Sequence, residues 1–276
     1  GGLGALSGTV PVEAALSYTD WRGVFLFLGS LTVLASAVIF IIVPKRNESE
    51  IKETSGGMKS QLNGVITVFT SPMFWWVAPF TVASQAAFLA TQSLWAGPWL
   101  HDVGGLERDQ VASHLLLVAA SMVAGFASSG VITDRLRRFG IKPLSIAVAG
   151  ISIFIIVQCL ITFRLVDAAL PLWMMFGFFG TTGILPYAAL SQKFPLHLSG
   201  RVTTGLNLLV FVSAFATQWA TGAIIGLWPK TAVGGYDPAG YQAAFGVIIG
   251  FQVLGLLWLI VFGKGRREFA IAQQDI

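Results

Sequence analysis

Long runs of apolar residues alternate with short polar segments along the whole chain. A helix needs about 20 residues to cross roughly 30 Å of hydrocarbon, and lipid offers no hydrogen-bond partner to a backbone group, so each run is expected to form a membrane-spanning helix. The runs do not alternate apolar and polar residues with a period of two, which argues against a β-barrel. The pattern predicts eight spans, at residues 1–19, 24–43, 73–99, 111–133, 143–163, 168–191, 202–228 and 243–263.

The composition agrees with this pattern. Of the 276 residues, 55% are hydrophobic and only 11% are charged, and the mean hydropathy is +0.75. A water-soluble domain of this length would not tolerate such a composition, so we predict an all-α, polytopic membrane protein. Cys159 is the only cysteine and lies within an apolar run, which excludes an internal disulfide and a cysteine-ligated metal.

The basic residues are distributed by side of the membrane. Of the 17 Lys and Arg residues, thirteen fall in alternate loops and at the C-terminal end, and four fall on the other side. Short loops rich in Lys and Arg stay cytoplasmic, so both ends of the chain are expected to be cytoplasmic, in a plasma or bacterial inner membrane. The lipid bilayer therefore explains the net charge of +4 without nucleic acid as a partner.

The most basic short segment joins the fourth and fifth expected spans and reads GVITDRLRRFG from Gly130. It predicts a tight turn at the membrane surface. Asp134 lies at the end of a helix, where the helix dipole disfavours a carboxylate, so we expect it to have a partner. Arg135, Arg138 or the N-terminus of another helix are the alternatives for that partner. An ordinary basic loop that only sets topology is the alternative interpretation of the whole segment.

The spacing Gly-x-x-x-Asp-Arg-x-x-Arg resembles the cytoplasmic signature loop of the major facilitator superfamily of secondary transporters. The chain matches it at Gly130, Asp134, Arg135 and Arg138, and departs from it at Arg137, where the family pattern usually has glycine. The resemblance implies a gating loop made of the four matching residues. The later segments FPLHLSGRV, QW and LWP resemble, more narrowly, a bacterial branch of this family with no settled substrate.

The only long loop, at residues 45–72, falls after two expected spans and before six. Members of the family have twelve helices in two six-helix halves. The resemblance therefore implies that residues 1–44 are the last two helices of the N-terminal half, that 45–72 form a cytoplasmic linker, and that 73–276 form the C-terminal half. The chain begins in the middle of a helical pattern without an initiator Met, so we expect a fragment whose partners include the four missing N-terminal helices.

Two expected spans carry the candidate binding chemistry. A stripe of polar and aromatic residues recurs at helical spacing along 73–99, and three glycines followed by Pro186 in 168–191 predict a helix that bends or partly unwinds. Interhelical hydrogen bonding, or a packed interface in the case of Asn207, is the alternative to ligand binding. The resemblance implies that these two spans face a central cavity. The candidate substrate-binding residues are Gln85, Gln92, Trp95, Thr182, Tyr187 and Asn207.

Glu13 is the only carboxylate within an expected span. An unpaired acid at that depth is costly and is a functional candidate, so Glu13 is predicted to be a proton-coupling group. A position close enough to the outer surface to reach water is the alternative.

The chain lacks the motifs of hydrolases and nucleotide-binding proteins, and the six spans from residue 73 onward have no Asp, Glu, Lys or Arg between their ends. These features disfavour an enzyme, and we expect no cofactor and no metal. The resemblance implies a gradient-driven transporter that moves a small-molecule substrate by alternating access, as a symporter, antiporter or uniporter. A transport-inactive membrane receptor or scaffold with the same fold is the alternative.

Overall fold

A computed structural model describes residues 4, 7–43, 58–231 and 234–272, and its regular elements are all helices. In chain order these elements are α2 (Val10–Leu16), α3 (Trp21–Ile42), α5 (Met58–Thr70), α6 (Pro72–Ala90), the π-helical η1 (Thr91–Trp95), α7 (Ala96–Asp102), α8 (Arg108–Arg138), α9 (Pro143–Thr162), the 3-10 turn η2 (Val166–Ala168), α10 (Ala169–Gly180), the 3-10 turn η3 (Thr181–Ile184), α11 (Leu185–Ser191), α12 (Leu196–Ile225) and α13 (Pro238–Ala272).

Seven helical stretches in the described part are long and apolar enough to cross a membrane. One is made of α6, η1 and α7 in succession, and another of η2, α10, η3 and α11. The expected first span is not seen as one, because α2 has seven residues and a rise of only about 10 Å. Residues 1–3 and 5–6 of that span, and residues 45–57 of the expected linker, lie outside the described residues.

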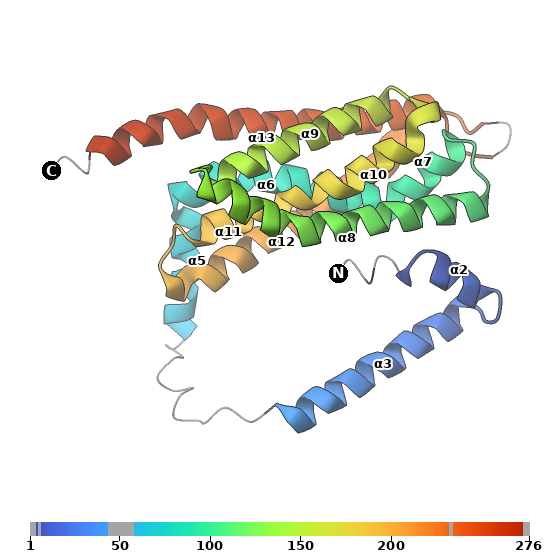
Figure 1. Cartoon of the computed structure of the whole chain (residues 1–276), viewed down its shortest axis with the longest axis horizontal. Helices are drawn as coiled ribbons and strands as arrows, with labels where there is room; N and C mark the ends of the chain where they lie inside the picture. Colours follow the sequence, from blue (N-terminus) through green and yellow to red (C-terminus); the bar gives the residue numbers. More distant parts are fainter. Residues whose placement is uncertain (1–3, 5–6, 44–57, 232–233, 273–276) are drawn as a thin grey trace.

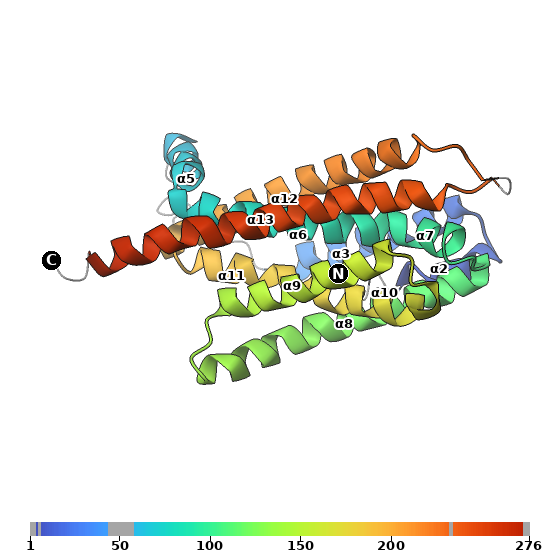
Figure 2. The ribbon, with the colours of Figure 1, turned by 90° about the horizontal axis from the view of Figure 1, so that it is seen from above.

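Helices α6 to α13 pack in one bundle with roughly parallel axes, as Figures 1 and 2 show. Within it, α6 packs between α12 and α13, and α10 packs against α8 and α9. Helix α3 is separated from the bundle in Figure 1, and none of its residues is buried. The two ends of the bundle differ in charge. We call the end where α8 stops and α9 starts the basic end, because it carries Arg135, Arg137, Arg138 and Lys142.

Helix starts in the bundle follow ordinary capping chemistry. Proline occupies the first turn of both α6 and α9, where its missing N–H removes no helical hydrogen bond. The side chain of Ser71 accepts the backbone N–H of Met73 at the start of α6. At the start of α8, Glu107 and Gln110 cap each other's backbone reciprocally.

Side-chain hydrogen bonds join α13 to its neighbours. The buried amides of Gln158 on α9 and Gln252 on α13 donate to each other at 3.0 Å in both directions. Near the basic end, the Trp76 indole donates to the carbonyl of Leu259 at 2.9 Å, and the Trp258 indole donates to the carbonyl of Trp75 at 2.8 Å. In a membrane, where helices gain little from leaving lipid, such bonds and close packing hold the bundle together.

Candidate functional site

Two interrupted helices meet near the middle of the bundle. The side-chain amide of Gln85 on α6 donates to the carbonyl of Gly180, the last residue of α10, at 3.3 Å. A Cβ atom on Gly183 would collide with the Gln85 amide, and one on Gly180 would collide with the ring of Phe88. Glycine is therefore required at both positions for α6 and the interrupted helix to approach this closely.

The carbonyls that precede η3 are satisfied by side chains. The hydroxyls of Thr181 and Thr182 donate to the carbonyls of Phe178 and Phe179 at 2.7 and 2.6 Å, and Gln85 supplies the donor for Gly180. A 3-10 turn disturbs the regular helical bonding, and Pro186 has no N–H to restore it. Irregular backbone in the hydrocarbon region needs such replacement partners.

The helix that runs from α6 to α7 is interrupted by η1, which was not predicted from the sequence although Gly97 and Pro98 follow it. Two contacts with α12 hold this π-helical segment. The Gln218 amide donates to the Ser93 hydroxyl at 2.7 Å, and the Trp95 indole donates to the Gln218 carbonyl at 3.3 Å. Single π-helical turns within α-helices occur frequently at functional sites.

The predicted binding residues fall in different surroundings. Trp95 is buried toward the end opposite the basic end, with its ring beside those of Tyr236 and Tyr241. Thr182 packs against Gly150 of α9. Gln92, in η1, is half-buried, and its side-chain amide makes no hydrogen bond to any group that the structure describes.

Tyr187 and Asn207 form a separate pair. The Tyr187 hydroxyl donates to the Asn207 amide oxygen at 3.4 Å and joins α11 to α12. Tyr187 also packs against the buried cluster near the basic end, which contains Phe74 and Leu190. The structure thus places the Gln85 side chain against the end of α10, and it brings Tyr187 together with Asn207. Trp95 contacts α12 and Thr182 contacts α9.

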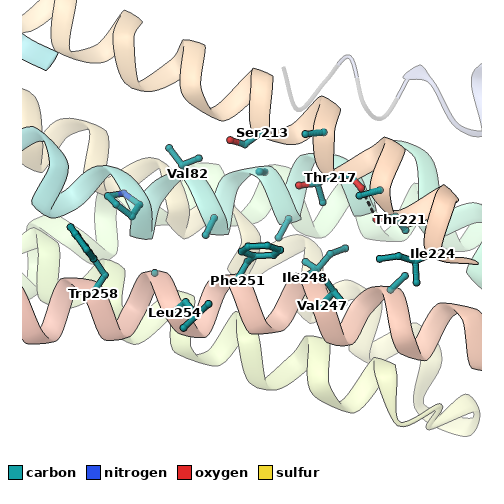
Figure 3. Close-up of a pocket in the computed structure, with 18 residues that line it drawn as sticks. Val82, Ser213, Thr217, Thr221, Ile224, Val247, Ile248, Phe251, Leu254 and Trp258 are labelled. Carbon is teal, nitrogen blue, oxygen red and sulfur yellow. Dashed lines mark hydrogen bonds between the residues drawn. The ribbon is translucent and has the colours of Figure 1, made fainter.

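A cavity of about 550 Å³ lies against a different set of α6 residues, between α12 and α13. Figure 3 shows Ser213, Thr217 and Thr221 of α12 on one wall and Phe251 of α13 on the other. None of the six predicted binding residues lines it. On α6 its lining is Pro79, Val82, Ala83, Ala86 and Ala87.

The basic segment differs from the tight turn that the sequence predicted. Helix α8 continues to Arg138, so Gly130, Asp134, Arg135 and Arg138 are helical. Its 31 residues span about 46 Å, which exceeds the roughly 30 Å of hydrocarbon, so the charged end can protrude into water. Arginines in a last turn also favour helix continuation, because they complement the negative end of the dipole.

The chain reverses instead at Gly140, which has a φ of 78°. The Ile141 N–H bonds to the Leu136 carbonyl and the Gly140 N–H to the Arg137 carbonyl, which is the Schellman arrangement that ends many helices. Glycine is needed here, at position 140, so the turn does not require one at Arg137.

Asp134 is exposed and has no hydrogen bond or ion pair with the residues that the structure describes. Neither Arg135 nor Arg138, two of the three alternatives for its partner, pairs with the Asp134 side chain among these residues. A Cβ on Gly130 would meet nothing within 4 Å, so the close approach expected there is not seen among the described residues.

Glu13 pairs with the opposite end of α8. Its two carboxylate oxygens accept Nε and Nη2 of Arg108 at 3.0 and 3.3 Å. The Glu13 side chain is 40% exposed and that of Arg108 78%. The geometry favours the alternative of an acid that reaches water, because Glu13 is neither unpaired nor buried.

A polar cluster that the sequence did not predict lies at the same end. The Asp102 side chain, only 7% exposed, accepts the Tyr241 hydroxyl at 2.7 Å and the Tyr236 N–H at 3.1 Å. His101 contacts its other oxygen at 2.8 Å. Asp102 thereby anchors the end of α7 to the segment that leads into α13. Tyr236 and Tyr241 are more than 130 residues away from Asp102 in sequence, so the local sequence pattern carried no signal for the cluster.

A bundle of apolar helices long enough to span a membrane, two of them interrupted, defines a helical integral membrane protein. A family model described as Major Facilitator Superfamily matches residues 1–218. The chain therefore belongs to the major facilitator superfamily, whose members are membrane transporters rather than enzymes. A search of the curated proteins finds no match to this chain.

Proposed function

We propose that this transporter moves a small solute that carries no net charge, using an ion or solute gradient and alternating access. The observation that carries the proposal is the contact between the two interrupted helices, where the Gln85 amide bonds to the Gly180 carbonyl. A ligand that competes for this amide would change the packing of both helices at once. Binding would then be linked to the arrangement of the spans that enclose the site.

The solute class follows from the chemistry of these spans. The six spans expected from residue 73 onward contain no Asp, Glu, Lys or Arg between their ends. The available groups are the amides of Gln85, Gln92 and Asn207 and the hydroxyl of Tyr187. Amides and hydroxyls recognise polar groups by hydrogen bonds, whereas a charged solute in the low-dielectric interior would need a counter-ion.

In this proposal α2 and α3 belong to one half of the transporter, α6 to α13 belong to the other half, and the basic end is cytoplasmic. Asp134, unpaired among the described residues, would meet the N-terminus of a helix of the first half when the cytoplasmic side closes. Such a contact is worth about 1 to 2 kcal/mol. Asp134→Asn should therefore favour the inward-facing state several-fold or more, with normal membrane insertion. In Asp134→Asn, spin-label distances between the basic ends of α3 and α8 should lengthen. Unchanged distances would mean that Asp134 only helps to set the topology of the chain.

Glu13 remains a candidate for proton coupling. The alternative is that its ion pair with Arg108 has only a structural role. If Glu13 couples transport, Glu13→Gln should remove the dependence of uptake on the proton gradient. If the ion pair is only structural, Arg108→Gln should change uptake by the same factor as Glu13→Gln, with both pH profiles unchanged. Exposed pairs of this kind contribute about 0.2 to 1 kcal/mol, so either variant should fold.

The proposal is tested by transport itself. The protein is reconstituted into vesicles and offered a panel of radiolabelled hexoses, neutral amino acids and nucleosides, with and without an imposed proton gradient. We expect saturable uptake of at least one solute above the level of vesicles without protein, and reduced uptake with Gln92→Leu. Saturable binding without uptake would instead support the receptor alternative.

A further inference from the structure

Helix α5 lies across the basic end of the bundle. It runs across the bundle axis and not along it, as both Figure 1 and Figure 2 show. Only Ser71 separates its last residue, Thr70, from the start of α6. The Trp75 indole fixes this corner by donating to the carbonyl of Phe69 at 2.6 Å. Because α6 crosses the membrane along the bundle axis and α5 runs across that axis, α5 lies along the membrane plane.

The surface of α5 is divided into three faces, and the first packs against the protein. Val68 is 0% exposed and Gly64 is buried. A Cβ on Gly64 would approach the guanidinium group of Arg201 to 2.7 Å, so Arg201 lies directly across the helix there. The ring of Phe69 lies 3.0 Å from the Cβ position of Gly205 on α12.

The second face is apolar and exposed. Leu62, Val65 and Ile66 are 58%, 42% and 49% exposed. They are spaced three and four residues apart and so form one stripe on the helix. No residue that the structure describes covers this stripe.

The third face is polar and exposed, and consists of Lys59, Asn63, Thr67 and Thr70. These residues also recur at three and four positions, and around the helix they lie between the apolar stripe and the buried face. A helix with a separate polar and apolar face, lying flat at the end of a membrane bundle, has the form of an interfacial helix.

Three tryptophans indicate the depth of α5 relative to the membrane. Trp75, Trp76 and Trp258 lie at the basic ends of α6 and α13, and their indoles are held by backbone carbonyls. Tryptophan is enriched where the hydrocarbon meets the headgroups. The corner between α5 and α6 is therefore at that boundary, and the apolar stripe begins there.

We propose that α5 docks on the membrane leaflet at the basic end, with Leu62, Val65 and Ile66 inserted into the hydrocarbon boundary and the polar face toward water. Arg201 sits at the same boundary. Its Nη1 donates to the His197 carbonyl at 3.1 Å, and a guanidinium group has five N–H donors. The donors that remain are placed for the phosphate of an anionic lipid headgroup. Gly64 makes room for this guanidinium group.

The test measures what surrounds each face. Single cysteines replace Leu62, Ile66, Asn63, Thr67 and Val68 in a Cys159→Ala background and are labelled with a nitroxide. The protein is reconstituted into vesicles of phosphatidylethanolamine and phosphatidylglycerol. Relaxation is measured with oxygen, which concentrates in lipid, and with a nickel chelate, which stays in water.

We expect oxygen to exceed the nickel chelate several-fold at positions 62 and 66, the reverse at 63 and 67, and low values for both reagents at 68. High nickel accessibility at 62 and 66 would show that the stripe faces water. Low accessibility to both reagents there would show that protein covers it, either another segment or a second copy of the chain. Either result would overturn the proposal.

A second measurement tests Arg201. Replacing phosphatidylglycerol by phosphatidylcholine should make labels at 62 and 66 shallower, and Arg201→Gln should produce the same change in anionic vesicles. Arg22→Gln, a change at the opposite end of the chain's spans, is the matched control and should leave the depth unaltered. Depths that do not respond to Arg201→Gln would overturn the assignment of this side chain to headgroups.

Discussion

The two interrupted helices of the bundle are broken in opposite senses. The stretch from α6 to α7 is loosened into a π-helical segment at Thr91–Trp95, whereas the stretch from α10 to α11 is tightened into a 3-10 turn at Thr181–Ile184. The second break contains or adjoins glycines and a proline that weaken an α-helix by themselves. The first contains none, although Gly97 and Pro98 follow it, and it is also held by Gln218 of α12.

This difference separates two causes of helix interruption. Gly180, Gly183 and Pro186 encode the second break locally, and neighbouring side chains only satisfy the carbonyls next to it. In the first break, the residues TQSLW have no helix-breaking member. Pro98 follows, however, and has no N–H for the carbonyl of Leu94, so the interruption has this local cause as well as partners on α12. We therefore expect the first to respond to changes on α12, and the second to respond to changes in its own glycines.

The largest effect is expected from Gly180→Val. The added side chain would meet Phe88, which is 4% exposed and packed against Phe154 and Phe176. Overpacking of this kind costs about 1 to 3 kcal/mol. Thermal unfolding in detergent should occur at a clearly lower temperature. Gly250→Val is the matched control, because a Cβ there meets nothing within 4 Å, and equal destabilisation by the two variants would contradict the contact.

Most of the fold was predictable because lipid leaves few choices. Apolar runs of sufficient length had to be helices, and seven of the eight expected spans are present in the described residues. The ends of the individual helices were less predictable. The expected span at 111–133 stopped before the first charge, whereas α8 continues to Arg138 because arginines are tolerated, and favoured, at the end of a long helix.

The site was predictable only in part. Helical spacing identified Gln85 and Trp95 as members of one stripe, but a polar side chain that meets a ligand and one that meets another helix give the same pattern. Trp95 bonds to the Gln218 carbonyl, and Gln85 to the Gly180 carbonyl. Partners 123 and 95 residues away cannot be read from local sequence. The glycines before Pro186 were informative, because their effect on the backbone is local.

An intermediate effect is expected at the contact between α6 and the end of α10. Gln85→Leu leaves the Gly180 carbonyl without its side-chain donor, which costs about 1 to 2 kcal/mol in a membrane. Gln92→Leu removes an amide that has no hydrogen-bond partner among the described residues, so the change in unfolding free energy should be within about 0.5 kcal/mol. Thermal unfolding and vesicle uptake are measured for both variants.

The pair distinguishes an amide that supports the fold from one that meets the solute. Gln85→Leu should lower both stability and uptake. Gln92→Leu should lower uptake alone. If the two variants lose equal stability, Gln92 has a structural partner and the separation of the two roles is wrong.

The smallest effect is expected at η1 and tests whether its π-helical form depends on α12. Ser93→Ala removes the hydroxyl that accepts the Gln218 amide at 2.7 Å. Interhelical hydrogen bonds in membrane proteins average about 0.6 kcal/mol, so amide exchange in residues 91–95 should rise about threefold. Adding Trp95→Phe keeps a ring beside Tyr241 but removes the second bond to α12, and should raise exchange further. Hydrogen–deuterium exchange mass spectrometry in lipid nanodiscs measures both variants.

Residues 181–184 provide the internal control, because their break comes from their own glycines and from Pro186. Exchange there should stay constant in both variants, while it changes in 91–95. The segment is also limited in how far it can relax, since Asp102 anchors the end of α7 through Tyr241 and Tyr236. The response should therefore be local to η1 and should not extend to the described residues beyond Asp102. Unchanged exchange in 91–95 would mean that TQSLW adopts the π-helical form without α12, and the two breaks would then share a local cause.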